Sequence, residues 1–168
     1  MKVKFLDLVK PADEKVGPVA KFACNDFVFV AELMNRNGDE LESDKEYEAD
    51  ATFFCHEICG VYKTLEDFQK DNPNIAEQSN IPMGAFSANS NDKNWKPSPL
   101  NYINTVVMSV IDNSLICAPN DILLFYGKTV SGQTIEEVLF YDEEEERDDV
   151  KKGYIVSGVF WCEITFKN

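Results

Sequence analysis

The chain has 168 residues, of which 44% are hydrophobic and 12% aromatic, so it is long and apolar enough to bury the core of one domain. These proportions are not those of a disordered chain. Its 30 acidic and 16 basic residues give a formal net charge of -14, which disfavours binding to the phosphates of a nucleic acid and suits a basic partner.

The five cysteines are odd in number and lie in apolar runs, which favours free thiols in a reducing compartment. Three lysines and an aspartate interrupt the first ten residues, so these residues do not form the apolar core of a signal peptide. No later stretch approaches the roughly 18 apolar residues that a membrane-spanning helix needs. We therefore expect a cytoplasmic protein without a membrane segment.

In the first half of the chain, alternating apolar residues predict strands over residues 2–9, 27–34 and 47–62, with a short apolar piece over 19–24. Asn37 and Gly38, in the turn after the second strand, predict backbone with positive φ. Thr64 stands three residues before Asp67, which is the spacing of an N-terminal cap, and predicts a short helix over about 65–71. Pro73 ends this helix.

In the second half, residues 72–99 contain four prolines and one apolar island, and we expect a long connection packed on the core. Four strands follow, over 102–111, 121–130, 134–141 and 153–166, with a hairpin turn at Ser131 and Gly132. Gly158 predicts a bulge or bend in the last strand that lets the sheet curl.

These elements predict a mainly β protein: a partly open, OB-like β-barrel with one short helix. We expect a single domain over 1–168, with N-terminal strands and the helix in 1–71, the connection in 72–99 and the four-strand half in 100–168. No internal repeat is visible in the sequence.

Four short segments of the second half, taken in their order along the chain, resemble the pattern of a known protein family. Residues 81–86 read IPMGAF, 97–99 read PSP, 131–132 read SG and 153–161 read GYIVSGVFW. In this order they resemble a family of small acidic bacterial proteins of unassigned function that is associated with an OB-like barrel. The resemblance covers about residues 80–164; after the Trp, where such proteins usually have Leu, this chain has Cys162. It implies the fold and no catalytic residue.

Cys55, His56 and Cys59 form the cluster that most resembles a metal site. A structural zinc site needs four ligands, and this chain has a single His. In an extended strand the two cysteines lie about 13 Å apart on one face, with His56 on the other. We therefore predict buried thiols, with no metal and no Cys–His nucleophilic pair. The chain lacks a glycine-rich phosphate loop, and we predict no cofactor and no catalytic residue.

Glu57 and Glu163 each interrupt an apolar run. Such a carboxyl could be held in a pocket with a raised pKa. It could also be a charge on an edge strand that discourages sheet-to-sheet association, and we favour this second interpretation.

For function we predict a non-catalytic binding protein whose acidic surface docks a basic protein partner, as an inhibitor or immunity-type protein would. The surface is centred on residues 142–149 and 39–50. The predicted partner-binding residues are Asp142, Glu143, Glu144, Glu145, Glu146, Asp148 and Asp149.

Two alternatives stay open. A hydrolase or transferase with an unrecognised carboxylate or Cys/His site would need a pocket that holds Glu57, Glu163 or His56 beside a cysteine. A single-stranded nucleic-acid-binding OB-like module would bring its lysines onto one face, namely Lys93, Lys96, Lys128, Lys151, Lys152 and Lys167.

Overall fold

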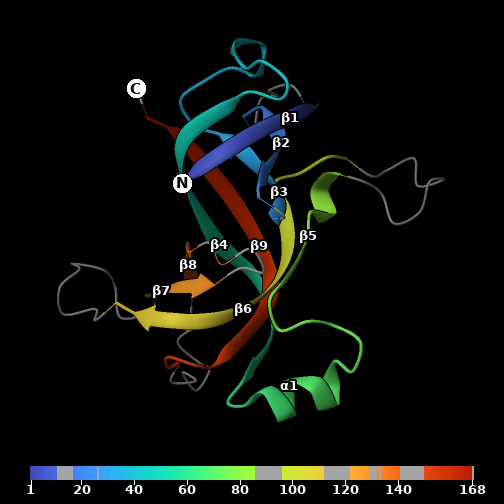
Figure 1. Cartoon of the computed structure of the whole chain (residues 1–168), viewed down its shortest axis with the longest axis vertical. Helices are drawn as coiled ribbons and strands as arrows, with labels where there is room; N and C mark the ends of the chain where they lie inside the picture. Colours follow the sequence, from blue (N-terminus) through green and yellow to red (C-terminus); the bar gives the residue numbers. More distant parts are fainter. Residues whose placement is uncertain are drawn as a thin grey trace.

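The computed structural model describes residues 1–10, 17–25, 27–85, 96–111, 122–128, 132, 134–140 and 150–167. Within these ranges the fold is mainly β with one α-helix, as the sequence predicted (Figure 1). The strands are β1 (Lys2–Lys10), β2 (Val19–Cys24), β3 (Phe27–Leu33), β4 (Glu46–Tyr62), β5 (Ser79–Ile81), β6 (Leu100–Val110), β7 (Ile122–Lys128), β8 (Thr134–Phe140) and β9 (Ile155–Phe166). The helix is α1 (Leu65–Asp71), and the short 3-10 turns are η1 (Gly38–Glu40) and η2 (Met83–Ala85).

The strands form one sheet that closes on itself twice. Their order is β1-β2-β3-β9-β4-β8-β7-β6-β5, and two further pairings join β1 to β4 and β6 to β9. These pairings create two circuits of five strands that share the ladder between β4 and β9. Figure 1 shows β1, β2 and β3 toward one end of the molecule and β6, β7 and β8 toward the other, with β4 and β9 running through both.

The two circuits repeat one pairing pattern. β1, β2 and β3 form an antiparallel meander, β4 pairs antiparallel with β1, and β3 runs parallel to β9. β6, β7 and β8 form a second meander, β9 pairs antiparallel with β6, and β8 runs parallel to β4. An approximate two-fold axis therefore relates the halves and passes through the β4–β9 ladder. The sequence shows no repeat, so the correspondence lies in the backbone.

The ladder between β4 and β9 is the longest in the sheet, from Ala49 opposite Phe166 to Tyr62 opposite Ile155. Its register shifts twice, between Cys55 and Glu57 and again between Ile58 and Gly60. Gly158 lies opposite this region, and a Cβ on it would stand 2.7 Å from the carbonyl oxygen of Glu57. The irregularity expected near Gly158 is confirmed, although the extra residues belong to β4.

Aromatic rings fill the first circuit. Phe22 and Phe29 have ring centroids 5.7 Å apart, and Phe29 and Phe53 pack edge to face at the same distance. Each such contact contributes about 0.5–1.5 kcal/mol beyond the burial of apolar area. Aliphatic residues take a larger share of the second circuit, where the buried side chains include Ile103, Val107, Phe125, Ile135 and Val156.

The helix α1 begins where its cap was predicted. The Thr64 hydroxyl accepts a hydrogen bond from the N–H of Asp67 at 3.1 Å. Phe68, on the inner face of the helix, is fully buried and packs edge to face on Tyr62 with ring centroids 5.3 Å apart. The helix therefore covers the end of β4.

The prediction of positive φ at Asn37 and Gly38 is wrong. Asn37 has a φ of -88°, and the described non-glycine residues with positive φ are Asn25 and Asp44. A Cβ on Gly38 would stand 2.3 Å from a methyl carbon of Leu8. A close side chain, rather than a left-handed turn, therefore explains the glycine.

A buried asparagine closes the seam where β3 of one circuit meets β6 of the other. The Asn101 side chain accepts a hydrogen bond from the N–H of Val30 at 2.9 Å and donates to the C=O of Val30 at 2.8 Å. Asn35 forms the same kind of pair with Phe166, at 2.9 Å for both bonds, but Asn35 is exposed. Side-chain amides thus substitute for a neighbouring strand at both places.

Replacing Asn101 with alanine should lower the free energy of unfolding by about 1–3 kcal/mol, because the buried N–H and C=O of Val30 lose their partners. The matched variant Asn35→Ala breaks the same kind of pair at an exposed position, where water can replace the bonds, and should cost less. Urea unfolding of both variants measures the difference. Equal losses would show that the seam does not depend on the Asn101 amide.

Candidate binding site

One row of side chains crosses four strands at the approximate two-fold axis. The register pairs Glu32 of β3 with Glu163 of β9, Glu163 with Thr52 of β4, and Thr52 with Glu136 of β8. All four residues are partly exposed. Neighbouring strands lie about 4.8 Å apart, so the row is about 14 Å long. We call these four residues the acidic row.

The two carboxylates at one end of the acidic row repel each other. Partial burial and the neighbouring Glu32 raise the pKa of Glu163. The N–H of Gly17 donates to Oε1 of Glu32 at 2.5 Å and balances part of this charge. A cation placed between Glu32 and Glu163 would remove the remaining repulsion.

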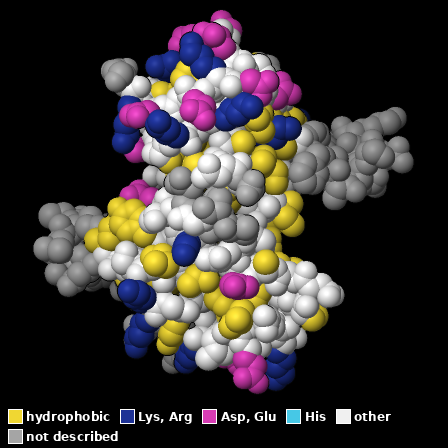
Figure 2. Space-filling view, in the orientation of Figure 1, with side chains coloured by type: hydrophobic (Ala, Val, Ile, Leu, Met, Phe, Trp, Pro, Cys, Tyr) yellow, Lys and Arg dark blue, Asp and Glu magenta, His cyan; other side chains and the backbone are white. Residues whose placement is uncertain are grey.

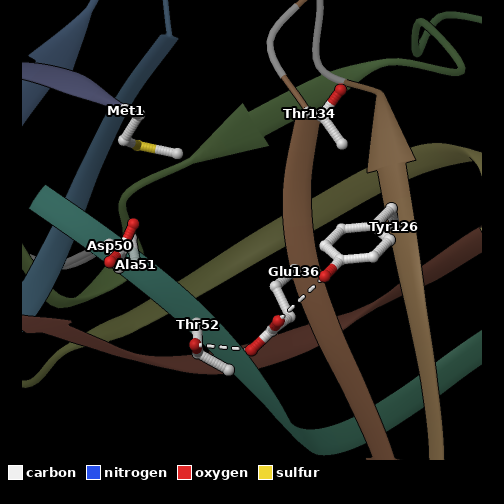
Figure 3. Close-up of a pocket in the computed structure, with 7 residues that line it drawn as sticks. All are labelled: Met1, Asp50, Ala51, Thr52, Tyr126, Thr134 and Glu136. Atoms are coloured by element: carbon white, nitrogen blue, oxygen red, sulfur yellow. Dashed lines mark hydrogen bonds between the residues drawn. The ribbon is translucent and has the colours of Figure 1, made fainter. Parts of the chain in front are cut away.

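Glu136, at the other end of the acidic row, points into a pocket of about 210 Å³ (Figure 3). The Thr52 hydroxyl donates to Oε1 of Glu136 at 2.9 Å, and the Tyr126 hydroxyl donates to Oε2 at 3.4 Å. Burial and the charge of Glu136 raise the pKa of Tyr126, so this hydroxyl keeps its proton. The pocket is lined by Met1, Asp50, Ala51, Thr52, Tyr126, Thr134 and Glu136.

A carboxylate oriented by two hydroxyl donors retains lone pairs for further donors. An ammonium or guanidinium group is the natural complement, because its hydrogen bond to a carboxylate is assisted by charge. The pocket can therefore hold the cationic end of a ligand. The sequence did not single out Glu136 or Glu32, because only the register of the folded sheet brings them into one row with Glu163.

The predicted acidic surface over residues 39–50 is present, and all seven of its carboxylates are exposed. Three of them have lysine partners: Glu42 with Lys45 at 2.6 Å, Asp44 with Lys4 at 2.8 Å and Asp50 with Lys167 at 2.9 Å. Within the described ranges the other four, Asp39, Glu40, Glu46 and Glu48, form no ion pair. We call residues 39–50 the acidic flank.

The acidic flank reaches the pocket, because Asp50 belongs to both. Figure 2 shows acidic and basic side chains together at the end of the molecule that carries β1 and the turns before β4. The other predicted docking segment lies outside the described residues, with all of Asp142, Glu143, Glu144, Glu145, Glu146, Asp148 and Asp149.

The predicted burial of the thiols holds for Cys24 and Cys162, and it is wrong for Cys59, which is exposed. Cys55 is half-buried, and burial is the main cause that raises its pKa to about 11. It is therefore a protonated thiol at neutral pH, which is a weak nucleophile. His56 is exposed beside it. Among the described residues, no group of three or more His, Cys, Asp or Glu side chains is placed to hold a metal ion.

Glu57 and Glu163 occupy different settings. Glu57 is exposed, and at this position β4 pairs with only one of the described strands, β9. This position agrees with the interpretation of Glu57 as a charge on an edge strand. That interpretation is wrong for Glu163, because β9 has partners on both sides at this position. Neither residue, nor His56, lines the pocket that holds Glu136.

Glu137, the neighbour of Glu136, points to the opposite face of β8 and is fully buried. Gly127 makes room for it: one oxygen of Glu137 and the hydroxyl of Thr105 lie 2.0 and 2.1 Å from the place where a Cβ on Gly127 would stand. Neither carboxyl oxygen accepts a hydrogen bond within the described part of the chain. Burial therefore raises the pKa of Glu137 well above its usual value.

This burial makes stability depend on pH. Above pH 4.5, the usual value for a glutamate, the unfolded chain has lost the proton that folded Glu137 still holds. Stability therefore falls as pH rises toward the raised pKa. Glu137→Gln should remove most of this fall and stabilise the protein at neutral pH. Urea unfolding between about pH 5 and pH 9 tests it. Glu57→Gln, at an exposed site, should keep the fall, and a fall of the same size in Glu137→Gln would contradict the assignment.

The lysines that a single-stranded nucleic-acid-binding module would bring onto one face do not lie together. Lys151 and Lys152 precede β9, and Lys167 follows it. The 12 residues of β9 separate them by roughly 40 Å of strand. Lys167 is also paired with Asp50 at 2.9 Å, and Lys93 lies outside the described residues.

Comparisons with protein-family models, with curated proteins and with solved structures find no match for this chain. No helix in the described ranges has the length and apolar character needed to cross a membrane.

Proposed function

We propose that this chain is a non-catalytic binding protein whose acidic surface docks a basic protein partner. The observation that carries the proposal is the acidic row, in which Glu32 and Glu163 stand side by side on paired strands and Glu136 stands on the far side of Thr52. Lysine or arginine side chains from a partner would relieve the repulsion between carboxylates and form charge-assisted hydrogen bonds.

The acidic flank supports the same partner. Four of its exposed carboxylates form no ion pair in the described part of the chain, although Lys4 and Lys2 stand opposite Glu46 and Glu48 on β1, so part of their charge is available to a partner. Such a field attracts a basic protein over several ångströms and speeds association at low salt. An inhibitor or immunity-type protein that covers a basic surface has this chemistry.

The finer assignment of the fold belongs to the same proposal. Each circuit has five strands, four antiparallel pairings and one parallel pairing. An OB-fold is a five-stranded, partly open Greek-key barrel, so the circuits support an OB-like relationship. Free thiols at Cys55, Cys59 and Cys162 support a cytoplasmic location.

Capture experiments test the acidic flank directly. Replacing Asp39, Glu40, Glu46 and Glu48 with their amides should weaken the capture of basic proteins by at least about ten-fold, because surface charges govern such association. The control variant replaces Glu57, Glu66, Asp71 and Glu77 with amides, which changes the net charge equally at other places. Binding of the captured proteins to both variants is measured over a range of salt concentrations.

The control variant should bind as the unmodified protein does, and capture should weaken as salt rises. Equal losses in the two variants would show that only net charge matters. Captured partners that are acidic, or whose binding does not respond to salt, would contradict a docking function for this surface.

A further inference from the structure

The pocket beside Glu136 lies at a gap in the ladder on one side of β4. Pairing with β1 ends at Glu48, after which Ala49 exchanges backbone hydrogen bonds with Met1, at 2.9 Å and 2.5 Å. Pairing with β8 begins at Thr52. Alternation along the strand turns the N–H of Ala51 toward this gap, and it has no backbone partner among the described residues.

The backbone of Thr134 faces the same gap. Phe53 of β4 lies opposite Glu137 of β8 in a parallel pairing. In such a pairing the backbone N–H and C=O of Phe53 bond to the residues before and after Glu137, which are Glu136 and Val138. Thr134 is two residues before Glu136, and its N–H and C=O therefore point toward β4 as well. No hydrogen bond of these two groups toward β4 occurs in the described part of the chain.

The approximate two-fold axis shows how the chain itself closes the equivalent gap. The axis passes between the paired residues Thr52 and Glu163, and so it relates Glu136 to Glu32. Two residues earlier on the outer strands, Thr134 corresponds to Val30, and one residue earlier on the inner strands, Ala51 corresponds to Cys162. The N–H and C=O of Val30 are both bonded to the amide of Asn101, and the N–H of Cys162 donates to the C=O of Pro99 at 3.0 Å. One amide group and one carbonyl thus satisfy that seam.

We infer that the pocket binds an extended segment of the basic partner, whose backbone bonds to Thr134 and Ala51 and whose lysine or arginine side chain reaches Glu136. The inference rests on the proposed function and names how the partner docks. A peptide unit offers the same donor and acceptor that Asn101 offers to Val30, and addition of a strand at an open ladder is a common mode of peptide recognition.

Size and charge favour this occupant. A volume of about 210 Å³ is below the roughly 300–1,000 Å³ of a typical small-molecule site, and it suits one inserted side chain. Asp50 already has Lys167 beside it at 2.9 Å. Among the described residues, Glu136 has two hydroxyl donors, Thr52 and Tyr126, and no ion pair, so it is the carboxylate left for an incoming cation.

The test uses a capped pentapeptide of alternating Val and Thr with a central Lys, titrated into the isotopically labelled protein and followed by NMR. We expect shifts of the amide signals of Ala51, Thr52 and Thr134.

Glu136→Gln should weaken binding about ten-fold or more, because it removes a charge-assisted hydrogen bond. The matched variant Glu57→Gln removes one carboxylate at an exposed place on β4 that does not line the pocket, and it should bind as the unmodified protein does. The amide spectra of both variants report whether the fold is retained.

Two further probes separate the backbone from the side chain. The same peptide with norleucine in place of Lys should bind about ten-fold more weakly, and butylamine alone should not shift the signals of Thr134. Shifts confined to other parts of the protein, equal losses in Glu136→Gln and Glu57→Gln, or full binding by butylamine would overturn the inference. Peptide binding that survives Glu136→Gln but is lost in the four-amide variant of the acidic flank would also overturn it, and would leave the proposed function standing.

Discussion

The antiparallel ladder between β4 and β9 is the constraint on which the rest of the structure depends. Each circuit has its own meander, but neither meander closes without both long strands. β3 pairs with β9, which ends the second half, and β8 pairs with β4, which ends the first half. The two register shifts in β4, opposite Gly158, bend the ladder so that it can serve both circuits.

The same ladder sets the positions of the charged side chains. Glu163 and Thr52 face each other across it, so the outer partners of these two strands bring Glu32 and Glu136 into the same row. Carboxylates from the two halves of the sequence therefore meet at the middle of the molecule. Because this area is half-buried, their charges are less screened by water than those of the acidic flank.

Local patterns in the sequence predicted much of the fold. Alternation placed the strands within a few residues of their observed bounds, and the spacing of Thr64 and Asp67 located the helix. Local patterns do not fix which distant strands pair, so the closed circuits and the acidic row could not be derived. The glycine at position 38 was misread, because its cause is contact with Leu8. Alternation in β8 could have shown that Glu136 and Glu137 face opposite sides, although not which one is buried.

The exchange of long strands between the halves has a consequence for synthesis on the ribosome. β9 is the last strand of the chain, and both circuits need it. The N-terminal meander emerges first and cannot close before β9 arrives, more than a hundred residues later. The nascent chain thus keeps unpaired strand edges for most of its translation, and its net negative charge disfavours association between such chains while they wait.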